Sequence, residues 1–400
     1  MTVVWPVSVL RRAVLTWGLL AACLAGCGGT SAGPAADGAW HVYPGESIQA
    51  ALDRAAANAT SKRVVVHAGT YRPSRPAQAL VWLNRRHDGI TLEALGRVVL
   101  TAENPELAAA AEESFPAIVN HVVYFGDGIS ARTVLRGFTI TGANRFQTRS
   151  DDPGPIEPNR PRLGKQNLLF FYCDGGGIKV FGRSYPRIER VVVTGNVASP
   201  CGAGLSIQHL GFQQDAVRIR DSIFRENRCQ VTGSAIDVLP GSRAEITNCL
   251  FVGNVANTGE DTVSPPGKLY NAEHGSGALT VFPGSRVQMT RCTLTGNWNG
   301  IDDKGQGNSY TDSIFWHNTL GGGKAPQGRY ELDILDAKNV AGCLFGGATV
   351  DLRGTIDAGS NRLDAPDPQF DEKFHPRCPD YSDVGYRAAE NLVPTRSKQR

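Results

Sequence analysis

The sequence is poor in methionine and in charge. Its 400 residues include only 2 Met, and Asp, Glu, Lys and Arg make up 20% of them, whereas Gly occurs 46 times. Little methionine and much glycine predict many tight turns and little helix. A hydrophobic content of 41% is typical of an ordered, soluble chain. The formal net charge of +3 gives no basic footprint, so we expect no nucleic-acid partner.

Several motifs of catalysis and metal binding are also missing. None of the 9 cysteines has the CxxC or Cys/His spacing that a zinc site needs. The three glycines from Gly175 are not a phosphate loop, because neither a helix start nor Lys-Ser/Thr follows them. The chain also lacks a nucleophile elbow.

The N-terminus has the pattern of an export signal. Arg11 and Arg12 precede a short apolar run, and small residues follow up to Cys27. The run is too short to span a membrane stably. Leu24-Ala25-Gly26-Cys27 resembles the lipobox of bacterial lipoproteins, which implies that residues 1–26 are a signal peptide and that Cys27 is lipid-modified.

Under this reading, residues 27–39 are a flexible tether, rich in Gly, Ala, Ser and Pro. Gly28 after the cysteine favours the outer membrane if the host is Gram-negative, again by resemblance. An ordinary secretory signal or a simple membrane anchor is the alternative, and both also export the chain.

Beyond Cys23 and Cys27 the chain has seven cysteines, an odd number in an oxidising compartment, so we expect at least one free thiol. Cys249, Cys292 and Cys343 occur in matching apolar contexts and are predicted to be small core residues. Cys173 and Cys201 occupy nearly equivalent repeat positions and are the pair favoured for a disulfide.

Two short patterns alternate between about residue 175 and residue 345. The first is led by glycine and is centred on Ile178, Leu205, Ile236, Leu279 and, in a degenerate copy, Ile301. The second is apolar-alternating and ends on Asn196, Asn227, Asn254, Asn297 and Asn318. The first pattern recurs after 27, 31, 43 and 22 residues, which fits one β-helix coil per interval, with an insertion in the longest.

Alternation predicts which side chains face inward: Val191, Val193, Ile219, Phe224, Ile246, Val287 and Met289. The five asparagines should stack at one corner and bond to each other and to backbone.

These repeats resemble those of the pectin-lyase-like superfamily, and also repeats of bacterial polymorphic outer-membrane passenger domains. The resemblance implies an all-β fold, a right-handed parallel β-helix (solenoid) with an N-terminal cap helix, over residues 40–375. The cap helix would lie within Tyr43–Ala55, with Ser47 as its N-cap and Ile48, Leu52 and Ala55 on one face. Inserted loops are expected near 143–170 and 255–274, and a closing segment and tail at 376–400.

Glycan-active members of the superfamily bind substrate along the outer face of one sheet, and the glycine-led strands are the candidate sheet here. Their outward positions form a column of Lys179, Ser206, Asp237, Thr280 and Asp302. Phe181, Gln208 and Phe282 are the next outward positions, two residues further along their strands. Lys179, Gln208, Phe181 and Phe282 are therefore the predicted substrate-binding residues.

Asp302, Asp303 and Lys304 form the sharpest cluster, because Asp303 falls on a position that is apolar in the other repeats. One interpretation is that Asp237, Asp302 and Asp303 bind Ca²⁺, with Lys304 as the base of a uronate lyase. The alternative is an ordinary surface turn, which has the same composition. His209 and His274 are further candidates for a catalytic base, and Asp237 with Asp302 would be the acid pair of a glycosidase.

The sequence thus predicts an envelope lipoprotein that binds an extended, acidic polysaccharide and either leaves it intact, cleaves it or epimerises it. A structural or adhesive surface protein without an active site is the competing interpretation. The oligomeric state stays open.

Overall fold

The computed structural model describes residues 33–148, 174–258, 277–321 and 329–388. Pro34–Arg400 forms one compact unit, and Met1–Gly33, which lies almost wholly outside the described residues, forms another. Within the described residues, parallel β-sheet dominates and there is one α-helix, α1 (Ile48–Ala57). The signal peptide, Cys27 and most of the tether therefore lie outside the described residues.

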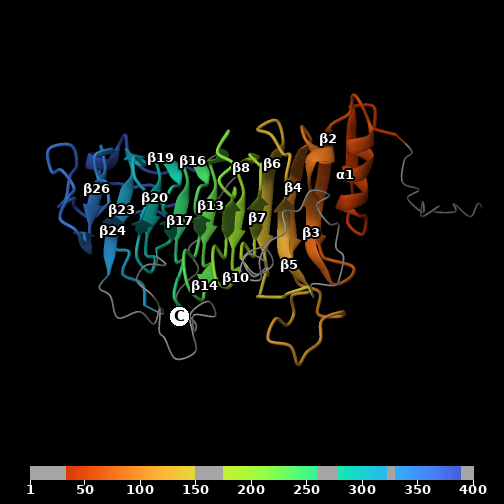
Figure 1. Cartoon of the computed structure of the whole chain (residues 1–400), viewed down its shortest axis with the longest axis horizontal. Helices are drawn as coiled ribbons and strands as arrows, with labels where there is room; N and C mark the ends of the chain where they lie inside the picture. Colours follow the sequence, from red (N-terminus) through yellow and green to blue (C-terminus); the bar gives the residue numbers. More distant parts are fainter. Residues whose placement is uncertain (1–32, 149–173, 259–276, 322–328, 389–400) are drawn as a thin grey trace, which may run out of the picture. The chain divides into compact units, whose positions relative to one another are not determined.

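Two long sheets carry nearly all of the strands, and their strands follow one another in chain order along the long axis of this unit (Figure 1). The nine-stranded sheet contains β3 (Ala77–Leu83), β5 (Val119–Phe125), β7 (Ile178–Phe181), β11 (Leu205–Gln208), β15 (Ile236–Val238), β18 (Leu279–Val281), β21 (Ile301–Asp303), β24 (Tyr330–Ile334) and β27 (Thr349–Asp351).

The larger, 16-stranded sheet begins with β1 (Ala39–Val42), β2 (Arg63–Tyr71), β4 (Thr91–Thr101) and β6 (Val134–Thr141). Beyond β6 it divides into two rows. One row is β8 (Arg187–Glu189), β12 (Val217–Arg220), β16 (Arg243–Thr247), β19 (Arg286–Thr290), β22 (Ser309–Thr311) and β25 (Val340–Ala341). The other is β9 (Val192–Thr194), β13 (Ile223–Arg225), β17 (Leu250–Val252), β20 (Thr293–Thr295), β23 (Ile314–Trp316) and β26 (Leu344–Gly346).

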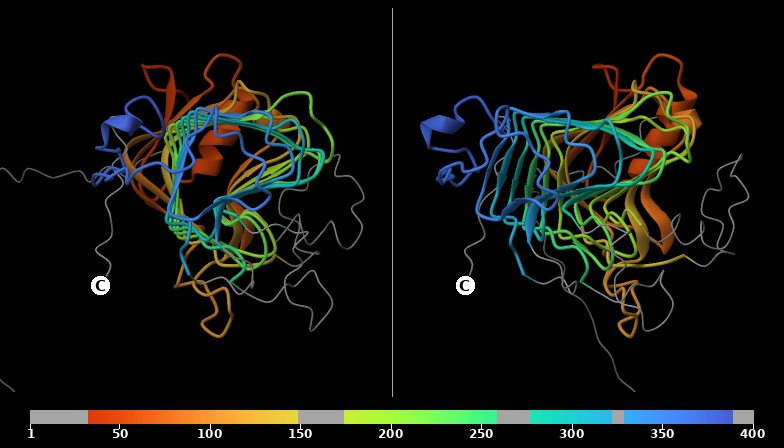
Figure 2. Two further views of the ribbon diagram at one scale, coloured as in Figure 1. Left: turned by 90° about the vertical axis from the view of Figure 1, so that its left-hand side faces the viewer. Right: turned by 60° about the vertical axis from the view of Figure 1, so that its left-hand side comes forward.

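The strand register confirms the repeat alignment. Leu205 pairs with Ile178 and with Ile236, and Leu279 pairs with Ile236 and with Ile301. The predicted interior residues are all buried in one continuous core. Each pass of the chain thus adds one strand to the nine-stranded sheet and one to each row of the larger sheet. The left view of Figure 2 looks along the axis of these coils, and the arrangement is compatible with a β-helix.

Two corners of each coil use left-handed backbone, which bends the chain sharply. The residues between the two rows have φ between 50° and 55°: Arg190, Asp221, Asn248, Arg291 and Asp312. The residues before the stacked asparagines also have positive φ: Gly195, Glu226, Gly253, Gly296 and His317. Repetition of the same bend keeps successive coils in register.

The asparagine ladder is confirmed. All five asparagine side chains are buried. Each side-chain amide donates to the next side-chain oxygen, at 3.1 Å from Asn196 to Asn227, 3.0 Å from Asn227 to Asn254, 2.9 Å from Asn254 to Asn297 and 2.8 Å from Asn297 to Asn318. The ladder ends on Glu331, whose carboxyl group accepts from Asn318.

The cysteines follow the predicted division only in part. Cys249, Cys292 and Cys343 are buried in the main core, as predicted. Cys201 is buried, and Cys173 lies outside the described residues, so the disulfide between them stays a prediction.

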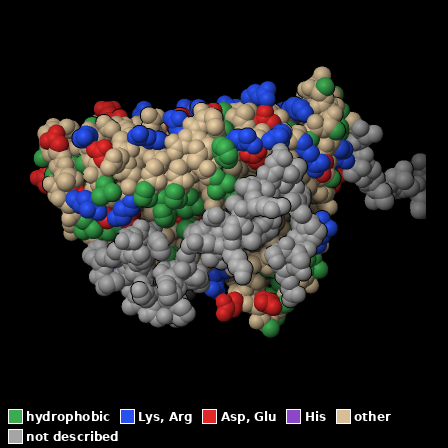
Figure 3. All heavy atoms as spheres, viewed as in Figure 1, with side chains coloured by type: hydrophobic (Ala, Val, Ile, Leu, Met, Phe, Trp, Pro, Cys, Tyr) green, Lys and Arg blue, Asp and Glu red, His purple; other side chains and the backbone are tan. Residues whose placement is uncertain are grey.

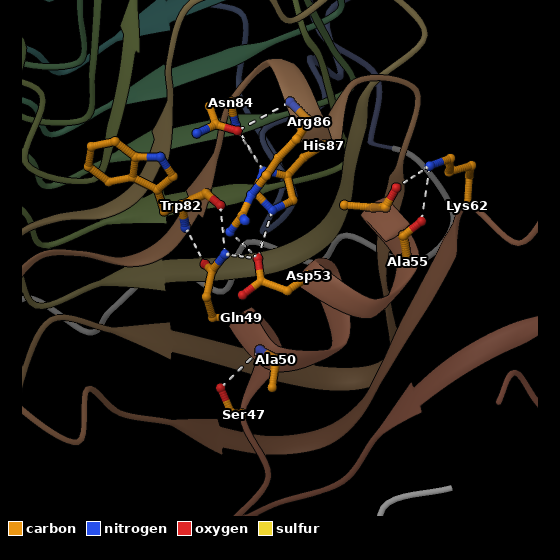
Figure 4. Close-up of polar contacts among 11 residues, drawn as sticks. Ser47, Gln49, Ala50, Asp53, Ala55, Lys62, Trp82, Asn84, Arg86 and His87 are labelled. Atoms are coloured by element: carbon orange, nitrogen blue, oxygen red, sulfur yellow. Dashed lines mark hydrogen bonds and ion pairs between the residues drawn. The ribbon is translucent and has the colours of Figure 1, made fainter. Parts of the chain in front are cut away.

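Helix α1 begins and packs as the sequence indicates. Ser47 accepts from the backbone N–H of Ala50 at 3.2 Å, and Ile48, Leu52 and Ala55 are buried. Gln49 then binds the edge strand β3, because its side-chain amide accepts from the N–H of Trp82 at 2.9 Å and donates to the Trp82 carbonyl at 3.1 Å (Figure 4). The glutamine thereby satisfies backbone groups that the edge strand would otherwise expose.

The C-terminal segment does more than close the chain. After β27 ends at Asp351, residues 356–388 run back over the outer face of the row that contains β26, β23, β20 and β17. Tyr381 packs with Ile314 and Leu344, and Tyr386 packs with Ile223 and Leu250. This segment covers an apolar stripe on the outside of five coils, from β13 to β26.

Candidate functional site

The outward positions of the nine-stranded sheet form one continuous polar column. The register aligns Lys179, Ser206, Asp237, Thr280 and Asp302 as predicted, and it adds Asp333 beside Asp302. Sequence reasoning missed Asp333, because β24 lacks the leading glycines that marked the other repeats. The first five of these side chains are no more than 2% exposed. Most of the outward column is therefore enclosed, although it was predicted to face a substrate.

The N-terminal part of the column is a closed hydrogen-bonded network. The Lys179 ammonium group lies 2.6 Å from Asp174 and donates to Gln208 at 2.9 Å and to Ser206 at 3.2 Å. Ser206 donates to the other oxygen of Asp174 at 2.7 Å. Burial raises the pKa of Asp174, and the charge of Lys179 opposes this. Because the polar groups of Lys179 and Gln208 bond to each other and to their neighbours in this buried network, they are poorly placed to contact a substrate.

Phe181 and Phe282 have different surroundings. Phe181 is buried in a small cluster with Trp82 and Tyr124, whose rings stack 4.2 Å apart. Phe282 is half-buried. Of the four predicted substrate-binding residues, only Phe282 keeps an appreciable exposed surface.

Asp237 is held by the loop that precedes its strand. Its two oxygens accept from the Thr232 hydroxyl at 2.6 Å and from the Gly233 N–H at 3.0 Å. Complete burial raises its pKa to about 8, although these hydrogen bonds oppose the rise. Asp237 therefore holds a proton at neutral pH.

Two hydroxyls beside Asp237 lack partners. Ser234 and Thr280 are buried, and neither side-chain oxygen makes a hydrogen bond within the described residues. An unpaired buried hydroxyl costs about 1–3 kcal/mol. A polar ligand or water at this face would remove that cost.

The C-terminal part of the column is charged and more open. Lys304 lies 2.9 Å from Asp302 and 2.7 Å from Asp333, and Arg353 lies 3.0 Å from Asp333. The side chains of Lys304, Asp333 and Arg353 are 16%, 13% and 40% exposed. Burial lowers the pKa of Lys304, but Asp302 and Asp333 outweigh it, and the net pKa is raised. Lys304 is consequently held in its charged form.

Asp303 faces the interior, on the opposite side of the strand from Asp302. Its oxygens accept from Gly305 N–H at 2.7 Å, from the Asn308 amide at 2.8 Å and from the Tyr310 hydroxyl at 2.8 Å. These bonds explain how a carboxyl group occupies an apolar position. Asp303 therefore does not join Asp237 and Asp302 in one ligand set. No group of three or more His, Cys, Asp or Glu side chains among the described residues could hold a metal ion.

His209 is also a buried structural residue. One ring nitrogen lies 2.9 Å from the Ser184 carbonyl, and the other accepts from the Arg243 N–H at 3.2 Å. Burial lowers its pKa to about 4. With both nitrogens engaged, the imidazole gives no support to a role as general base. His274 lies outside the described residues.

The two predicted loops lie mostly outside the described residues, but their ends are described. Short bridges pair Asn144 with Val197 and Val255 with Arg228, beside the small ladder of β10 (Val197–Ala198) and β14 (Arg228–Cys229). Both insertions therefore leave from the same corner of the coil and return to the nine-stranded sheet, before β7 and β18 respectively.

Another charged surface is balanced. Lys and Arg side chains gather along the upper edge in Figure 3, where the row β8, β12, β16 and β19 lies in the view of Figure 1. Arg218 of this row lies 2.8 Å from Asp215 and 3.1 Å from Glu245. Because Arg218 already has two carboxylate neighbours, it offers a weaker site for an anion than the composition of the row indicates.

Comparisons with known proteins add little. No family model and no curated protein matches the chain. A crystal structure of Escherichia coli YbhC aligns with 86% of this chain and 82% of that chain, at 13% sequence identity and a TM-score of 0.35. A likeness at that level carries no inference about function. Among the described residues, no helix is long and apolar enough to cross a membrane.

Proposed function

We propose that this protein is an envelope lipoprotein that binds an extended polysaccharide along the outer face of its nine-stranded sheet. The observation that carries the proposal is the polar column of six consecutive strands, which becomes charged at Asp302 and partly exposed at Lys304 and Asp333. Neighbouring strands lie about 4.8 Å apart, so an elongated ligand that lies along this face from Lys304 and Asp333 passes successive strands at a regular spacing. The hydroxyl of Thr280, which has no partner within the described residues, is a hydrogen-bonding group of this column that such a ligand could use.

The fold in this proposal is a right-handed parallel β-helix. Strand order that follows chain order in both long sheets supports it, and so does the single buried core. Helix α1 covers one end of the core in this proposal, because it packs on β1, β2 and β3 and binds the edge of β3 through Gln49.

The lipid anchor at Cys27 rests on the sequence resemblance alone. Metabolic labelling with a radioactive fatty acid tests it. We expect label in the wild-type chain and none in Cys27→Ser, and label in neither chain would contradict the anchor.

Binding is favoured over cleavage by a lyase. A lyase base must give up its proton before it acts, whereas Lys304 is held protonated between two carboxylates. The two acids of the glycosidase alternative stand two strands apart, and Asp237 is buried with both oxygens occupied. Neither reaction therefore gains support from the described geometry.

Titration calorimetry with a panel of neutral and acidic oligosaccharides, with and without Ca²⁺, tests the proposal. The protein would begin at residue 28, which retains the whole compact unit from Pro34. We expect saturable binding that weakens by about tenfold or more in Lys304→Met. Lys338→Met, at an exposed lysine outside the column, is the matched control. No binding to any glycan would favour the structural or adhesive interpretation, and product formation would restore the enzymatic one.

A further inference from the structure

An indole ring and a guanidinium group occupy the corner that leads into the open end of the column. Trp298 lies four residues before Asp302, and Arg329 lies four residues before Asp333. Because Asp302 pairs with Asp333, these are equivalent positions on adjacent coils. Four residues of strand extend about 13 Å at most, so both side chains belong to the neighbourhood of the charged group at Lys304.

The same position is glycine on three earlier coils. At Gly175, Gly202 and Gly233 a Cβ atom would lie 2.6–2.7 Å from the carbonyl oxygen three residues further on. Trp298 and Arg329 therefore replace glycines that fit a tight corner elsewhere. A large aromatic ring and a cation at two successive copies of that corner are not needed to build the coil, since the other coils form without them.

The two side chains contact each other and present only donors. The Arg329 guanidinium carbon lies 3.2 Å from the centre of the Trp298 ring. Trp298 is 1% exposed, packs with Val255 and Leu320, and its indole N–H has no hydrogen-bond partner in the described part of the chain. No carboxylate is paired with Arg329 there either, and burial lowers its pKa. Indole and guanidinium groups have no acceptor to offer.

We propose that Trp298 and Arg329 form a subsite for an anionic substituent of the bound glycan, namely the carboxylate of a uronate or a sulfate ester. The planar guanidinium matches such oxyanions in a bidentate way, and the buried indole N–H gains the acceptor that it lacks. The column itself is a poor site for an anion, since each of its cations, Lys179, Lys304 and Arg353, already pairs with a carboxylate of the column. Selectivity for acidic glycans would thus come from the corner and not from the column. The glycan as ligand rests on the proposed function, whereas the anion site does not.

Matched glycans test the subsite. Oligouronates would be compared with their carboxyl-reduced, neutral counterparts by titration calorimetry. We expect the oligouronate to bind about tenfold more tightly to the wild-type protein. This preference should fall to about threefold or less in Arg329→Gln and in Trp298→Phe, which keeps an aromatic side chain but removes the indole N–H. A sulfated oligosaccharide forms the third arm and distinguishes the two anions. Arg362→Gln removes a cation that pairs with Asp380 elsewhere, and it should leave the preference intact.

A second readout separates this inference from the proposed function. Free glucuronate should raise the melting temperature of the wild-type protein more than glucose does, and it should not do so in Arg329→Gln. If no oligosaccharide binds but this glucuronate effect remains, the anion site stands and the glycan-binding proposal fails. A preference for anionic ligands that is absent, or that is unchanged in both variants, overturns the inference.

Discussion

The asparagine ladder and the polar column run along the same coils and differ in composition, burial and hydrogen bonding. The asparagine ladder repeats one residue five times, is buried throughout, and each of its amides has partners on the next coil and on backbone. The column on the nine-stranded sheet changes residue at nearly every coil, includes Thr280, whose hydroxyl has no partner within the described residues, and opens at one end. Uniform and saturated groups serve the fold, whereas varied and incompletely paired groups are available for a ligand.

The asparagine ladder should be the more costly of the two to break. Asn254→Ala removes the acceptor of the Asn227 amide at 3.0 Å and the donors to Asn297 at 2.9 Å and to the Phe224 carbonyl at 2.9 Å. Buried groups would be left unpaired, so we expect the free energy of unfolding to fall by about 3–5 kcal/mol. Urea denaturation measures this loss. Asn339→Ala, at an exposed asparagine, should change it by no more than about 0.5 kcal/mol.

The carboxyl end of the same ladder should make stability depend on pH. Burial raises the pKa of Glu331 from 4.5 to about 8. Because the folded-state pKa exceeds the unfolded one, the contribution is complete below pH 4.5 and is lost as the pH rises through 8. Glu331→Gln keeps the shape without the titration, and it should be more stable than wild type at pH 9 by about 1–3 kcal/mol. The contribution is largely present at about pH 5 and lost at about pH 9. If the stability curves of the two proteins ran parallel between these two pH values, this role of Glu331 would be refuted.

The open end of the column should matter more for binding than for folding. Lys304 is only partly exposed and its removal leaves the buried Asp302 carboxylate without a cation, so Lys304→Met should cost about 2 kcal/mol of stability, less than Asn254→Ala. The same variant should lose most of the glycan affinity. A large loss of stability with unchanged affinity would indicate that the column serves the fold and not a ligand.

The smallest effect is expected at the unpaired hydroxyl. Thr280→Val removes a buried group without a partner in the described chain, so the free energy of unfolding should stay within about 1 kcal/mol of wild type or rise slightly. Thr232→Val is the matched comparison, since its hydroxyl donates to buried Asp237 at 2.6 Å, and it should destabilise the protein clearly. Equal losses in the two variants would indicate that Thr280 has a structural partner.

Much of the fold was predictable because it repeats. The spacing of Ile178, Leu205 and Ile236 gave the register of the sheet, and the recurring asparagines gave the ladder. Each of these signals arises from neighbours one coil away, which a repeat pattern records directly.

The exposure of the column could not be predicted in the same way. Period-two alternation tells that Lys179 faces away from the core, but not that Asp174 folds back over it. Glu331 and Trp298 were missed for a related reason, since the repeat alignment ended at Ile301 and the corner residues outside the strands were not compared. Comparison of the corner positions alone would have marked Trp298, where earlier coils have glycine.

Hydrogen exchange with and without a bound oligosaccharide tests the central claim most directly. The account predicts that the ligand slows exchange of backbone amides in β21 and β24, next to Lys304 and Asp333, and leaves the 16-stranded sheet unchanged. Protection confined to the 16-stranded sheet, or to the segment 356–388, would contradict binding at the nine-stranded face.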